Sequence, residues 1–143
     1  MFEKLFMLVK SNAGMAVLNN PLIPVKNHEA IINEASSSII DVLKAQIETG
    51  KLKDLVKYFQ FPGIYSGNPL IGTTVNKFAN RLNNYYGIDP ADAMITAKAL
   101  IPQVMQQLIA KSQSKIENEF SLSHLLEMIS GNYNATVKQL AVA

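Results

Sequence analysis

Hydrophobic residues recur every three or four positions along most of the chain, which is the spacing of one face of an α-helix. Residues 28–48 show the pattern clearly, with Glu34, Asp41 and Glu48 on the side opposite the apolar face. Residues 2–18 carry a comparable apolar stripe: Phe2, Leu5, Phe6, Val9, Ala13, Ala16 and Val17. No segment alternates between apolar and polar positions, as a half-buried strand would. The pattern predicts an all-α fold.

Helix ends are marked by capping residues, prolines and glycines. Gly50 and Gly87 are expected to end helices because glycine tolerates positive φ, while Asn27, Asn68 and Asp89 are expected to cap helix starts. The predicted helices are 2–18, 28–48, 51–60, 69–85, 90 to about 112, and 122–130. We therefore expect residues 1–143 to form one domain of about six helices.

The two ends of the chain are expected to be less firmly held than the middle. Gly14 weakens the helix over residues 2–18 by on the order of 1 kcal/mol relative to alanine, which favours a peripheral place for residues 1–18. Residues 132–143 are weakly patterned and predict a loose tail.

The segment from residue 90 to about 112 is apolar over most of its circumference, which is typical of a helix in the middle of a fold. Pro102 lies inside it. A proline there removes one backbone hydrogen bond and clashes with the carbonyl of Lys98. We expect a kink in the central helix at Pro102.

The two short predicted helices share a pattern, because Leu52 and Leu55 correspond to Leu122 and Leu125. The long helices before them also align. One interpretation is a duplicated hairpin made of a long and a short helix. The other is that any two amphipathic helices can be aligned by sliding one along the other.

Composition indicates a globular chain with a real core, since it is 48% hydrophobic and 17% charged. The net charge is only +2 and the bases are not segregated, so a basic arm for nucleic acid is missing. Cysteine is absent, which excludes disulfides and a cysteine nucleophile. No apolar run approaches a membrane span, and Leu5 to Val9 is too short for a signal-peptide core. We expect a cytoplasmic protein.

Candidate chemistry is sparse. The only histidines are His28 and His124, and His124 forms a single i, i+3 pair with Glu127. Metal sites in helical bundles use this spacing but need further ligands, so we interpret the pair as part of a polar helix face. We therefore expect no catalytic, cofactor-binding or metal-ligating residues, and no enzymatic activity.

Two connecting segments are unusually apolar for loops, which are normally polar. Their apolar residues are Leu22, Ile23 and Val25 in the first, and Phe61, Ile64 and Tyr65 in the second. These side chains either fill gaps between helices or form a surface for another chain.

The leading hypothesis is therefore a non-enzymatic protein-interaction or assembly module that binds a protein partner or a second copy. The alternative is a nucleic-acid-binding domain that uses Lys77, Arg81 and the asparagines of residues 69–85. Two bases are few compared with the roughly 6–10 phosphate contacts that useful affinity takes. A third class is a small-molecule binder or enzyme with a pocket between the hairpins.

Three motifs resemble those of the YidB-like family, small bacterial helical proteins of unknown function. They are Gly67-Asn68-Pro69-Leu70-Ile71, Tyr86-Gly87-Ile88-Asp89-Pro90 and Leu100-Ile101-Pro102-Gln103-Val104. Together with Gly50 to Phe59, the resemblance covers about residues 50–108. It implies a multihelical fold, supplies no catalytic residues and leaves the function open.

Overall fold

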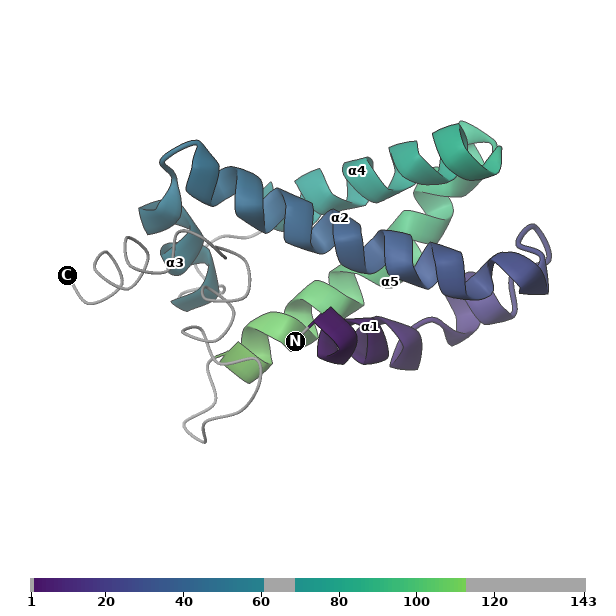
Figure 1. Ribbon diagram of the computed structural model, residues 1–143, viewed down its shortest axis with the longest axis horizontal. Coiled ribbons are helices and arrows are strands. Elements are labelled where there is room, and N and C mark those ends of the chain that lie inside the picture. The colour runs from purple at the N-terminus through teal and green to yellow at the C-terminus, as the bar shows by residue number, and fades with distance from the viewer. Residues whose placement is uncertain (1, 61–68, 113–143) are drawn as a thin grey trace.

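The computed structural model describes residues 2–60 and 69–112 (Figure 1). Over these residues the structure is helical and has no strand, which confirms the prediction of an all-α, multihelical fold. The elements are α1 (Phe2–Ser11), a π-helical turn η1 (Gly14–Leu18), a 3-10 turn η2 (Val25–Asn27), α2 (His28–Glu48), α3 (Leu52–Gln60), α4 (Pro69–Tyr86) and α5 (Pro90–Ser112).

Four of the predicted helices have the expected ends, give or take one residue. Gly50 and Gly87 take φ values of +76° and +64° where α2 and α4 end. Asp89 caps α5, because its Oδ2 accepts a hydrogen bond from the Ala91 N–H at 3.1 Å. The cap predicted at Asn27 is wrong. This residue has helical φ and ψ at the end of η2, and its side chain makes no capping bond.

The single helix predicted over residues 2–18 is also wrong, because it breaks after Ser11. The side chains of Ser11 and Asn12 both donate to the carbonyl oxygen of Leu8, each at 2.8 Å. They compete for the acceptor that the backbone N–H of Asn12 would use in an α-helix. That N–H instead donates to the oxygen of Val9 at 3.0 Å. The chain becomes helical again at Gly14, now as a π turn.

The N-terminal segment belongs to the core within the described residues, which corrects the peripheral position expected for residues 1–18. Leu5, Val9, Ala13 and Val17 are at most 1% exposed, because α1 packs on α2 and α5, and η1 packs on both of them as well. Asn12 and Gln107 also exchange two amide hydrogen bonds, of 3.0 and 2.9 Å. These bonds tie the end of α1 to α5.

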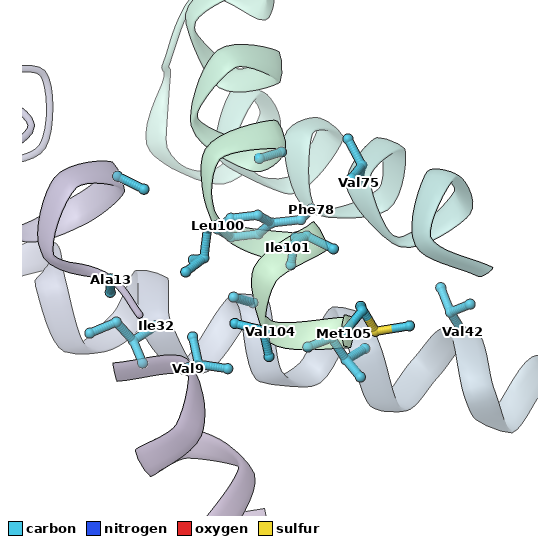
Figure 2. Close-up of a cluster of buried hydrophobic side chains, with 14 of the residues drawn as sticks. Val9, Ala13, Ile32, Val42, Val75, Phe78, Leu100, Ile101, Val104 and Met105 are labelled. Carbon is cyan, nitrogen blue, oxygen red and sulfur yellow. The ribbon is translucent and has the colours of Figure 1, made fainter. Parts of the chain in front are cut away.

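Helix α5 has the most extensive buried face among the described elements, as its apolar circumference indicated. It packs against α4, α1, η1 and α3. Figure 2 shows side chains of α5 meeting Phe78 of α4, Ile32 of α2 and Val9 of α1. The buried residues of α5 are Ala93, Thr96, Ala97, Leu100, Ile101, Val104, Met105, Leu108 and Ile109. Pro102 lies within the helix, which continues to Ser112, and a kink at Pro102 stays a prediction.

Several sequence-based predictions fall outside the described residues. These are the short helix 122–130 with His124 and Glu127, the tail 132–143, and the connecting segment with Phe61, Ile64 and Tyr65. The second short helix of the proposed duplication is among them, so the repeat stays a hypothesis.

Candidate interaction surface

The segment that joins α1 to α2 contains three of the residues predicted to form an interaction surface. The structure divides them. Ile23 is 4% exposed and fills a gap inside the chain, so its assignment to an interaction surface is wrong. Leu22 and Val25 are 53% and 81% exposed. Only these two of the three are available to a partner.

Hydrogen bonds of Asn20 hold the turn in which Ile23 is buried and Leu22 is exposed. Its Nδ2 donates to the oxygen of Ala16 at 3.0 Å and to Oγ1 of Thr96 at 3.2 Å. Its Oδ1 accepts from the backbone N–H of Leu22 at 2.9 Å, and its carbonyl accepts from the N–H of Ile23 at 3.1 Å. These bonds anchor the turn to η1 and α5, and prolines at 21 and 24 restrict its φ angles further.

Two further exposed apolar side chains precede this turn in η1. Met15 is 84% exposed, and Leu18 is exposed as well. Neither residue was predicted from the sequence, although both lie outside the apolar stripe of residues 2–18, which is the signal that could have identified them. We call Met15, Leu18, Leu22 and Val25 together the apolar corner. Figure 1 shows the segment that carries it at one end of the molecule, beside the start of α2.

The π-helical turn η1 determines how Met15 and Leu18 are presented. The N–H groups of Leu18 and Asn19 donate to the oxygens of Ala13 and Gly14, five residues back, at 3.0 and 2.8 Å. Ala16 and Val17 of the same turn are buried. Short π-helical segments are rare and often occur at functional sites. Here the turn points two residues into the core and two outward.

Charged residues of both signs border the apolar corner. Lys26 and Glu29 follow Val25 closely, and both are exposed. Neither forms an ion pair with another residue in the described parts of the chain. The corner is thus an uncharged surface with one positive and one negative group at its edge.

The face of α4 proposed for nucleic-acid binding has two basic residues, Lys77 and Arg81, and Arg81 is engaged in a contact within the chain. Nη2 of Arg81 lies 2.6 Å from Oδ2 of Asp41, and its Nη1 donates to Oγ of Ser38 at 3.3 Å. Asp41 was expected on a solvated stripe of α2, and its side chain is indeed 44% exposed, but it also pairs with Arg81 of the neighbouring α4. Lys77, Asn76 and Asn80 remain at least partly exposed.

An electrostatic interaction also links Glu34 of α2 to Tyr86 of α4. Oε2 of Glu34 is buried and has no hydrogen-bond partner among the described residues. Burial first, and the negative charge of Glu34 second, raise the pKa of Tyr86 above its ordinary value. Glu34 was expected on the solvated stripe of α2, and this is only partly correct because its Oε2 is buried. These two groups alone do not provide a nucleophile together with its base.

Within residues 2–60 and 69–112, no three acidic or histidine side chains are grouped as metal ligands would be. None of the helices described there combines the length and the apolar content that crossing a bilayer requires. No family model matches the chain, and no curated protein or solved structure matches it either.

Proposed function

We propose that this protein is a non-enzymatic assembly module that associates with a second copy of itself through the apolar corner. The observation that supports the proposal most strongly is the concentration of four exposed apolar side chains between residues 15 and 25. Connecting segments normally present polar residues to water. Contiguous exposed apolar surface marks sites of protein interaction.

Two physical features favour binding at this place. Burying apolar surface gains roughly 25 cal/mol per Å² removed from water, so the exposed parts of Leu22 and Val25 provide a driving force. The hydrogen bonds of Asn20 already order the turn. Binding therefore involves little further loss of conformational entropy.

The charges favour a second copy as the partner. In a two-fold contact the same patch of each subunit faces the other. Lys26 of one copy can then lie opposite Glu29 of the other, so that each charge meets its opposite. A net charge of +2 also causes little repulsion between two copies.

The test is the association of the double variant Leu22→Ser/Val25→Ser. We expect sedimentation velocity to show concentration-dependent association of the unaltered protein and a shift toward monomer in the variant. Met7→Ser is the matched control, since Met7 is 58% exposed on α1 outside the apolar corner. A monomeric unaltered protein would contradict the proposal, and so would equal association of the variant.

Nucleic-acid binding through α4 is less well supported, because Arg81 is engaged with Asp41. The dependence of binding on salt concentration distinguishes the two proposals. Association that persists at high salt supports the apolar corner, whereas binding to duplex DNA that falls steeply with salt supports the α4 surface. The cytoplasmic location stays a proposal that rests on the short apolar runs of the sequence, and the relation to the YidB-like family stays one that rests on the sequence motifs.

A further inference from the structure

We infer that Met15 is an oxidation site and that its conversion to the sulfoxide weakens the association of this protein. This inference rests on the proposed function, because Met15 belongs to the apolar corner. Its thioether side chain is 84% exposed, more than any other large hydrophobic side chain among the described residues.

The other methionines of the described residues differ in their access to solvent. Met7 is 58% exposed on α1, Met94 is partly buried, and Met105 is fully buried at 0%. Oxidation of methionine by a peroxide follows exposure of the sulfur. We therefore expect Met15 to react first, Met7 next, and Met105 only when the fold opens.

The reaction needs a peroxide and no other reactant. A sulfur lone pair of Met15 attacks one oxygen of hydrogen peroxide, the O–O bond breaks and an S–O bond forms, and the proton of the attacked oxygen passes to the departing hydroxide. The sulfur loses two electrons and becomes a sulfoxide, and hydrogen peroxide is reduced to water.

The sulfoxide changes the apolar corner without disturbing the core. Met15 contributes its side chain to the surface, while Ala16 and Val17 of the same turn carry the packing. Oxidation turns a flexible apolar group into a polar one. Burying that polar group against a second copy without a hydrogen-bond partner is unfavourable.

Association should in turn protect Met15, because a contact that buries the apolar corner shields its sulfur from peroxide. Raising the protein concentration should therefore slow the oxidation of Met15 and leave the rate at Met7 unchanged.

The experiment treats the full chain with hydrogen peroxide, measures each methionine by peptide mass spectrometry, and follows association by sedimentation velocity. We expect oxidation of Met15 to weaken self-association by about tenfold or more. The Met15→Leu variant keeps an apolar side chain of similar volume and has no sulfur at this position. It should associate like the unaltered protein and resist peroxide, whereas Met7→Leu should stay sensitive. Circular dichroism checks that the treated chains remain helical.

The outcomes separate this inference from the proposed function. If the untreated chain is monomeric, or if Leu22→Ser/Val25→Ser associates normally, the proposed function fails and the inference fails with it. If the untreated chain associates and the chain oxidised at Met15 associates equally well, the inference alone is overturned. Equal sensitivity of Met15→Leu and the unaltered protein to peroxide would also overturn it.

Discussion

At the scale of single residues, the surroundings decide the role of a side chain more than its chemistry does. Leu22 and Ile23 are neighbours with nearly the same hydrophobicity, yet Leu22 is exposed and Ile23 is buried. The hydrogen bonds of the Asn20 side chain and carbonyl set the direction of the turn. They therefore decide which of the two side chains points to the core.

Tyr86 leads to a prediction about alkaline stability. Burial, and then the charge of Glu34, raise its pKa in the folded state. A group with a raised folded pKa contributes stability that is complete below its unfolded pKa and is lost as pH rises through the folded pKa. We expect Tyr86→Phe to reduce the loss of stability between about pH 9 and pH 12, measured by urea unfolding across that range.

The matched control for this prediction is Tyr85→Phe, because Tyr85 is exposed on the same helix. Tyr85→Phe should lose stability with rising pH as the unaltered protein does. If Tyr86→Phe loses as much stability at high pH as the unaltered protein does, the Tyr86 hydroxyl is not the source of the effect.

At the scale of the helices, residues within about one turn decide most of the boundaries. Asp89 caps α5 through its own side chain, and Gly50 ends α2 with a positive φ. The break between α1 and η1 also has a local cause, since Ser11 and Asn12 bind the carbonyl of Leu8. This break was not predicted from the sequence, because the apolar stripe over residues 2–18 continues across it.

Pro102 gives a prediction at the same scale. Proline is about 3 kcal/mol less favourable than alanine inside a helix. We expect Pro102→Ala to restore the hydrogen bond to the Lys98 carbonyl and straighten α5, since Pro102 is only partly buried. The free energy of unfolding should rise by up to about 3 kcal/mol, measured by urea denaturation. A lower stability than that of the unaltered protein would show that the core packs around a bend.

At the scale of the whole molecule, the described residues share one core that joins α1, η1, α2, α3, α4 and α5, and an ion pair also connects α4 to α2. Core side chains from distant parts of the chain meet in Figure 2. The Arg81–Asp41 pair joins two residues that are 40 positions apart. This arrangement leaves the apolar corner uncovered by the described helices, at the edge of the structure.

The proposed two-fold contact gives a prediction about charge. Lys26→Glu alone and Glu29→Lys alone should each weaken self-association, because each places like charges opposite one another. The double exchange Lys26→Glu/Glu29→Lys restores opposite charges and should recover the association. Sedimentation equilibrium measures the self-association of the unaltered protein, the two single variants and the double variant. If the double exchange associates no better than the single variants, the two residues do not face each other across a two-fold axis.

The sequence alone was sufficient to predict the helical class, most helix ends and the extensive burial of α5, since periodicity and capping depend on residues within about four positions. Only the tertiary structure placed the N-terminal segment in the core, paired Arg81 with Asp41, and separated Ile23 from Leu22 and Val25. These features depend on contacts between residues far apart in the chain. The helical period tells which side chains share a face, but not which neighbouring element covers it.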